Sequence, residues 1–104
     1  MVMTDIAHSA STYFNAAVAA YQRGDYAASA EYYRAGLASQ PEDTAPYVDY
    51  AKVCEFLGDW DHALAALDKA LFAEPDNEPA RRRQQRILEE RVAFEQLADA
   101  LNTP

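Results

Sequence analysis

Apolar residues recur every three or four positions in five separate segments of the chain, which is the spacing of an amphipathic helix. In the first segment Tyr13, Ala16, Ala17 and Ala20 fall on one side of such a helix. The pattern predicts helices over residues 9–23, 26–39, 45–57, 60–73 and 78–101. The sequence therefore predicts an all-α fold.

Turn residues between the predicted helices support these bounds. Gly24 and Gly58 follow a helix, where glycine supplies the left-handed conformation that a side chain resists. Asp25 and Asp59 come next and can accept hydrogen bonds from the free amides of the following helix. Prolines end the second and fourth helices, at Pro41 and Pro75.

The remaining helix starts carry weaker signals of the same kind. Thr44 is the predicted N-cap of the third helix, with Pro46 tolerated in its first turn. Asp76 and Asn77 are candidate caps for the fifth helix. This last helix is longer than the others, because no turn signal interrupts its apolar stripe of Ile87, Leu88, Phe94, Leu97 and Leu101.

A single period of 34 residues relates the two halves of the region before residue 78. It connects Gly24 to Gly58, Asp25 to Asp59, Tyr26 to Trp60, Leu37 to Leu71 and Pro41 to Pro75. A fixed period of this length is typical of stacked helix-turn-helix units. Such stacks need a terminal element with a polar outer face, so residues 78–101 are interpreted as a capping helix. The alternative is a dedicated arm that binds a partner.

These phased positions resemble the tetratricopeptide repeat (TPR) family. Its 34-residue pattern is matched at bulky positions by Tyr13, Tyr47, Tyr33 and Leu67, at small positions by Ala17, Ala51, Ser29, Ala63, Gly36 and Ala70, and at proline by Pro41 and Pro75. The chain departs from the pattern at Ala20 and Cys54, where a tyrosine is usual, and at Arg81, where an inward-packing residue is usual.

The resemblance implies a right-handed α-α superhelix of two helix-turn-helix repeats followed by a C-terminal capping helix. The repeats would occupy residues 9–77, as units 10–43 and 44–77, and the cap residues 78–101. We expect residues 1–8 to form a flexible N-terminal segment and residues 102–104 a short tail.

The resemblance also implies a concave groove lined by the first helix of each pair. Its expected peptide-binding residues are Phe14, Asn15, Val18, Tyr21, Val48, Asp49, Lys52, Phe56, Arg82, Arg83 and Arg86. The apolar members would capture an apolar or amphipathic segment of another protein, and the arginines would pair with its acids. The alternatives are that residues 2–6 or a second copy of the chain fill the groove.

One known TPR specificity is not expected here. Some TPR domains hold a C-terminal carboxylate with lysine and asparagine at set groove positions. Phe14, Val18 and Asp49 stand at three of those positions, so the resemblance argues against a carboxylate clamp.

The net charge of the chain indicates which kinds of partner it can bind. The net charge is −8, and residues 1–77 hold all of the excess, with 12 acids and 4 bases. Such a surface repels nucleic acid and anionic membrane faces and favours a protein partner. The run Arg81–Arg83 does not change this, because acids follow on the same helix. Neither nucleic-acid binding nor membrane insertion is expected. Cys54 is the single cysteine, which favours a reducing, cytoplasmic setting.

Candidate chemistry is sparse. Asp59, Asp61 and His62 have metal-ligand side chains, but acids at a helix start are better explained by the helix dipole. Cys54 on an apolar helix face is interpreted as a buried, unreactive thiol. We therefore expect no enzyme, no metal and no cofactor. The predicted function is a small adaptor or chaperone-like binder, and the alternative is a scaffold that self-assembles through the groove and the C-terminal helix.

Overall fold

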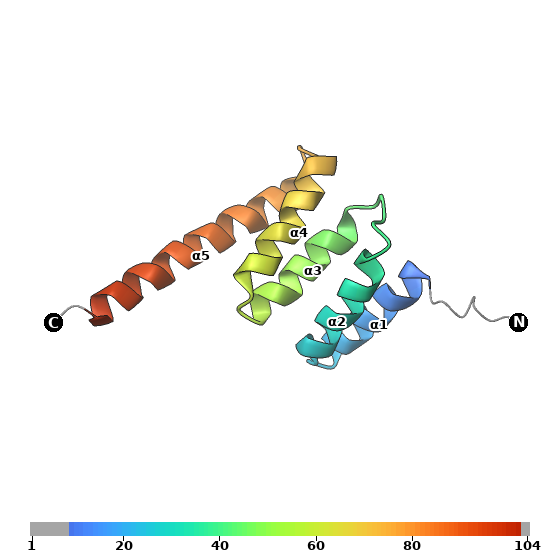
Figure 1. Cartoon of the computed structure of the whole chain (residues 1–104), viewed down its shortest axis with the longest axis horizontal. Coiled ribbons are helices and arrows are strands. Elements are labelled where there is room, and N and C mark those ends of the chain that lie inside the picture. Colours follow the sequence, from blue (N-terminus) through green and yellow to red (C-terminus); the bar gives the residue numbers. More distant parts are fainter. Residues whose placement is uncertain (1–8, 103–104) are drawn as a thin grey trace, which may run out of the picture.

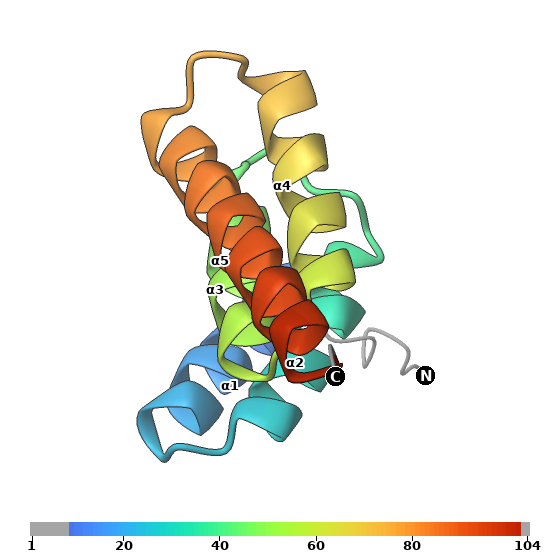
Figure 2. The same ribbon diagram turned by 90° about the vertical axis from the view of Figure 1, so that its left-hand side faces the viewer.

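The computed structural model describes residues 9–102, and these form five helices (Figure 1). They are α1 (Ala10–Gln22), α2 (Tyr26–Leu37), α3 (Ala45–Phe56), α4 (Trp60–Ala73) and α5 (Glu78–Asn102). Consecutive helices are antiparallel neighbours. Helices α1, α3 and α5 form one layer, and α2 and α4 form the other (Figure 2). The prediction of an all-α repeat fold is confirmed. The expectation of a flexible segment over residues 1–8 lies outside the described residues.

Both glycine–aspartate turns adopt the predicted geometry. Gly24 and Gly58 have φ values of 79° and 74°. The Asp25 carboxylate accepts the amide hydrogen of Ala28 at 3.1 Å, and Asp59 accepts that of His62 at 3.2 Å. Because each turn both ends one helix and begins the next, the predicted bounds of α1, α2 and α4 agree with the structure to within two residues.

Thr44 is not the side-chain cap that the sequence predicts. Its backbone is already helical, with φ −86° and ψ −16°, whereas a capping residue usually adopts an extended conformation. The hydroxyl instead donates to Glu74 Oε1 and accepts from Asn77 Nδ2, the latter at 3.2 Å. Asp43 accepts the amide hydrogen of Ala45 in its place. Thr44 thus ties the start of α3 to the turn between α4 and α5.

Small residues allow the helices to approach closely. Ala17, Ala51, Ala63 and Ala70 are fully buried, and Leu67 and Ile87 are the largest fully buried side chains. The Ser29 hydroxyl is also fully buried and donates to the carbonyl of Ala17 at 2.8 Å, so its burial leaves no polar group unpaired. The family's small positions are therefore helix contact points.

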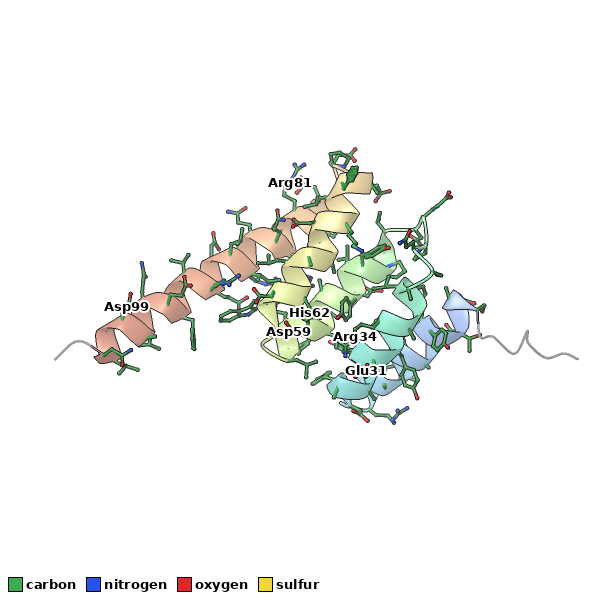
Figure 3. The ribbon with its side chains drawn as sticks, in the orientation of Figure 1. Glu31, Arg34, Asp59, His62, Arg81 and Asp99 are labelled. Atoms are coloured by element: carbon green, nitrogen blue, oxygen red, sulfur yellow. The ribbon has the colours of Figure 1, made fainter. Side chains whose placement is uncertain are left out.

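Arg81, one of the departures from the family pattern, avoids the core. Its guanidinium group turns back to the carbonyl of Pro75 and to Glu78, at the start of α5 (Figure 3). An arginine is accommodated here because its side chain remains 53% exposed, so its charge is not buried.

The apolar stripe of α5 is only half covered. Ile87 is buried, whereas Phe94, Leu97 and Leu101 are 59%, 58% and 77% exposed. The expected capping helix therefore covers the repeats only as far as Phe94, whose ring contacts that of Trp60, and not over its whole predicted length to residue 101. The reason is length: α5 extends about 37 Å and α4 only about 21 Å. Residues 92–102 are here called the overhang, because α5 leaves the repeats at Phe94 and projects past them from there to its end (Figure 1).

Candidate binding groove

Two adjoining hollows lie on the layer formed by α1, α3 and α5. The first, of about 250 Å³, is lined by Val18, Tyr21, Gln22, Tyr33, Asp49, Lys52 and Val53. The second, of about 340 Å³, is lined by Lys52, Glu55, Phe56, Arg83 and Arg86. They share Lys52 and together are called the groove. A third hollow, at the start of α3, includes Val48 and shares Asp49 with the first.

An aromatic cluster forms the apolar part of the groove. The ring of Phe56 stacks on that of Tyr26 at 4.9 Å and lies 5.9 Å from that of Tyr21. Phe56 nevertheless remains 57% exposed, and Val18 across the groove is 43% exposed. The rings thus hold one another in place while presenting apolar surface to water. Tyr26 was missed at the sequence level because it belongs to α2, a helix of the other layer.

Lys52 lies at the centre of the groove. Its ammonium nitrogen is 4.6 Å from the centroid of the Tyr21 ring, within range of a cation–π interaction. Asp49 is one turn away on α3, and partial burial raises the pKa of its carboxyl group, although Lys52 and Arg83 act in the opposite direction. The groove therefore offers one cation beside its aromatic wall.

Two of the predicted arginines are engaged within the chain. Arg83 Nη1 donates to Glu55 Oε1 at 2.7 Å, and Arg86 Nη2 donates to the same oxygen at 3.2 Å. Burial acts to raise the pKa of Glu55, but the hydrogen bonds with Arg86, Glu90 and Arg83 outweigh it and hold the pKa below its ordinary value. The expectation that these arginines wait for a partner's acids is therefore corrected, because Glu55 already neutralises much of their charge.

Besides Val48, which lines the third hollow, three predicted groove residues lie outside the groove. Phe14 packs between α1 and α2, where its ring lies 6.0 Å from that of Tyr33 and covers Gly36. A Cβ atom at Gly36 would lie 2.8 Å from Phe14 Cδ1 and closer still to Cε1, so the missing side chain makes room for the ring. Asn15 and Arg82 are exposed but do not line these hollows.

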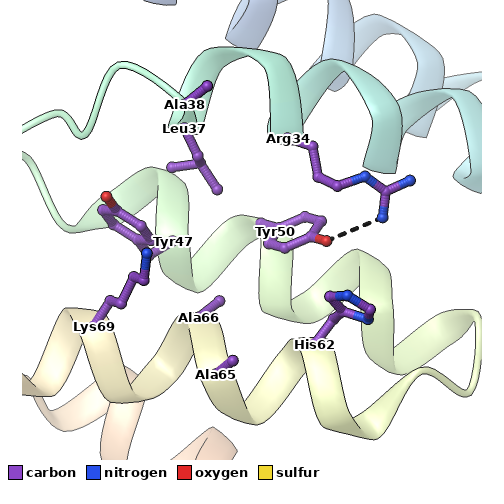
Figure 4. A pocket seen from close by; sticks show the side chains of 9 residues that line it. All are labelled: Arg34, Leu37, Ala38, Tyr47, Tyr50, His62, Ala65, Ala66 and Lys69. Carbon is purple, nitrogen blue, oxygen red and sulfur yellow. Dashed lines mark hydrogen bonds between the residues drawn. The ribbon is translucent and has the colours of Figure 1, made fainter.

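A further hollow, of about 280 Å³, lies on the other side of the molecule between α2 and α4 (Figure 4). The rings of Tyr47 and Tyr50 border it, and Arg34 donates to the Tyr50 hydroxyl at 3.2 Å. Burial raises the pKa of Tyr50 to about 12, so this hydroxyl stays protonated. This hollow was not predicted from the sequence, where the available signal was the set of small residues Ala38, Ala65 and Ala66.

The other candidate chemical groups have structural partners. His62 Nδ1 lies 2.8 Å from Asp59 Oδ2 at the exposed start of α4 (Figure 3). Burial acts to raise the pKa of Asp59, but hydrogen bonds from His62 prevail and lower it. Burial raises the pKa of the Cys54 thiol, which makes it a poor nucleophile. Across residues 9–102, no three His, Cys, Asp or Glu side chains gather as metal ligands would.

Comparison with known proteins agrees with this geometry. The family model described as tetratricopeptide repeat matches residues 20–87, which span both turns, the groove helix α3 and the buried part of α5. No curated protein matches the chain. Within the described part of the chain, no helix is long and apolar enough to cross a membrane. Tetratricopeptide repeats generally mediate protein–protein interaction and are generally not enzymes. The chain belongs to the tetratricopeptide repeat family.

Proposed function

We propose that this protein is a small adaptor or chaperone-like binder that captures an apolar or amphipathic segment of another protein in the groove. The observation that carries the proposal is the exposed apolar surface of Val18 and Phe56 on either side of Lys52. Exposed apolar side chains that gather around a hollow are typical of interaction sites.

The aromatic cluster would supply most of the affinity. An apolar side chain from the partner would pack against Val18 and against the rings of Tyr21 and Phe56, which already hold one another in position. Loss of a single anchor of this kind commonly costs about 2 kcal/mol of binding free energy. Preformed rings lower the entropic cost of binding, because few side chains must be ordered.

Lys52 would instead select for acids in the bound segment. The groove residues carry three positive and two negative charges, whereas the whole chain has a net charge of −8. Long-range attraction between exposed charges acts mainly on the rate of association and is screened by salt. We therefore expect Lys52→Gln to slow binding at low salt and to have little effect at high salt.

A display library of random peptides provides a defined probe of the groove. Peptides selected on the wild-type protein are tested against the double variant Val18→Ala/Phe56→Ala. The matched control is Tyr32→Ala/Phe72→Ala, which removes two exposed aromatic side chains from α2 and α4, the other layer. Circular dichroism checks that both variants keep their helices.

The proposal predicts that the groove variant loses binding by at least about tenfold, whereas the control binds like the wild type. The groove assignment is wrong if the selected peptides bind the groove variant normally and lose binding to the control. Selected peptides should also be rich in apolar residues with at least one acid.

A further inference from the structure

The overhang has the composition of a ligand for the groove. Phe94, Leu97 and Leu101 form its exposed apolar stripe. Glu95 and Asp99 are its charged residues, and residues 92–102 contain no lysine or arginine. Its net charge is therefore negative, while that of the groove lining is positive.

We propose that the groove of one copy of this chain receives the overhang of a second copy. The inference rests on the proposed function, since it takes the groove as the binding surface and names an occupant for it. The apolar stripe would meet the aromatic cluster. Glu95 and Asp99 lie on the other side of the overhang helix, so they would act at longer range, through the attraction between the negative overhang and the positive groove lining. Both surfaces are exposed in the single chain, so neither must be uncovered first.

The contact must join two molecules. Within one chain the overhang points away from the repeats, and Asp99 lies at the opposite end of the molecule from α1, which forms part of the groove (Figures 1 and 3). Two different surfaces meet, so the contact is heterologous. Two such contacts close into a dimer when each copy fills the other's groove. A contact that is not returned in this way extends from copy to copy.

The contact is small. The overhang is about 16 Å long, and a standard stable interface buries about 800 Å² on each partner. Self-association should therefore be reversible and depend on protein concentration. A foreign segment that binds the groove would compete with the overhang, so self-association would regulate access to the groove.

The test measures the mass of the full chain by analytical ultracentrifugation from micromolar to millimolar concentration. The overhang variant is Leu97→Glu/Leu101→Glu, and the groove variant is Val18→Glu. All three positions are exposed, so folding should be retained. The control Val92→Glu/Gln96→Glu adds the same charge as the overhang variant to exposed positions on the opposite face of the helix.

We expect the mass of the wild type and of the control to rise with concentration. Each of the two variants alone should associate at least about tenfold more weakly. An equimolar mixture of the two should form a mixed complex, because one supplies an intact overhang and the other an intact groove. If Val18→Glu lowers helicity in circular dichroism, Phe56→Ala replaces it.

Three results would overturn the inference: a wild type that is monomeric throughout, a groove variant that associates like the wild type, or a mixture that forms no complex. Association that survives in the groove variant but is lost in the overhang variant would indicate direct pairing of two overhangs. A monomeric wild type whose groove still binds the selected peptides would leave the proposed function standing.

Discussion

Three glycines in this chain act in two physically distinct ways. Gly24 and Gly58 have positive φ values, and a Cβ atom built on either would meet nothing within 4 Å. Their role is conformational alone. Gly36 lies inside α2, and there a Cβ atom would collide with the ring of Phe14. Its role is to leave space between two packed helices.

For Gly58→Ala we expect the free energy of unfolding to fall by about 1 kcal/mol, because an L-residue resists the left-handed conformation. Urea denaturation measures the change. Asparagine tolerates this conformation better, so Gly58→Asn should cost less than Gly58→Ala. Equal stability of the wild type and Gly58→Ala would contradict the conformational explanation.

Gly36→Ala should destabilise the protein even though alanine is the better helix former. Overpacking a helix interface typically costs about 1–3 kcal/mol. Phe14→Leu replaces the ring with a smaller side chain and should relieve this collision. The double variant Gly36→Ala/Phe14→Leu should therefore lose less stability than the sum of the losses in the two single variants. A double-mutant cycle by thermal or urea denaturation measures this coupling, and strict additivity would argue against the contact.

The helix ends were predicted correctly from the sequence where the signal lies within a few residues of the end. The Gly–Asp turns predicted the ends of α1 and α3 and the starts of α2 and α4, because a cap depends only on residues within one turn. Thr44 failed as a cap because its hydroxyl is bound by Glu74 and Asn77, which are 30 and 33 positions away.

The groove residues, too, could be predicted from the sequence only where they depend on the local helical repeat. The repeat register brought Val18, Lys52 and Phe56 to one face, since helical periodicity decides which face a residue occupies. It could not show that Glu55 pairs with Arg83 and Arg86, because that depends on the separation of α3 from α5. Nor could it show that Gly36 draws Phe14 into the interface between α1 and α2.

The pairing of Glu55 with the arginines should make the docking of α5 sensitive to acid. The pKa of Glu55 in the folded protein lies below its ordinary value of 4.5. Its contribution to stability is therefore complete above that value and is lost as the pH falls through the lower, folded-state pKa. Glu55→Gln should cost about 1–2 kcal/mol at neutral pH and progressively less in acid.

Urea denaturation of the wild type and Glu55→Gln at a series of pH values measures this difference. Glu89→Gln, at an exposed position of α5, is a matched control that should behave like the wild type at every pH. A gap between wild type and Glu55→Gln that does not narrow on acidification would rule out the ion pairs as its source.

The whole molecule is extended rather than spherical. Its dimensions are 66 × 30 × 20 Å, and its radius of gyration is 16.1 Å, compared with about 13 Å for a compact domain of this length. The overhang contributes to the difference, because it adds length at one end while its Leu97 and Leu101 remain exposed. Removal of the end of the overhang should therefore change the radius of gyration more than the free energy of unfolding.

A chain that stops after Gln96 should have a smaller radius of gyration in dilute solution and a free energy of unfolding within about 1 kcal/mol of the wild type. It loses the exposed Leu97 and Leu101 but keeps Ile87 and the contact of Phe94 with Trp60. Small-angle scattering and thermal denaturation measure the two quantities.

A chain that stops before Glu78 should behave differently and lose cooperative unfolding. It removes Ala80 and Ile87 from the core cluster that also contains Leu67. Two repeats alone bury too little surface for stable folding. A cooperative, fully helical melt of residues 1–77 would contradict this view of α5.

The winding of the apolar stripe around α5 affects the direction of any helix that packs on its exposed part. Ala80, Ile87, Phe94 and Leu101 are spaced by seven residues, and a straight helix falls about 20° short of two full turns in that interval. Over three intervals the stripe winds about 60° around the helix axis. Leu101 therefore faces a different direction from Ala80, and a helix that covers Phe94 and Leu101 cannot run in line with α4. It would have to cross α5 obliquely, so a second copy that docked on the overhang would be rotated about the α5 axis relative to the first.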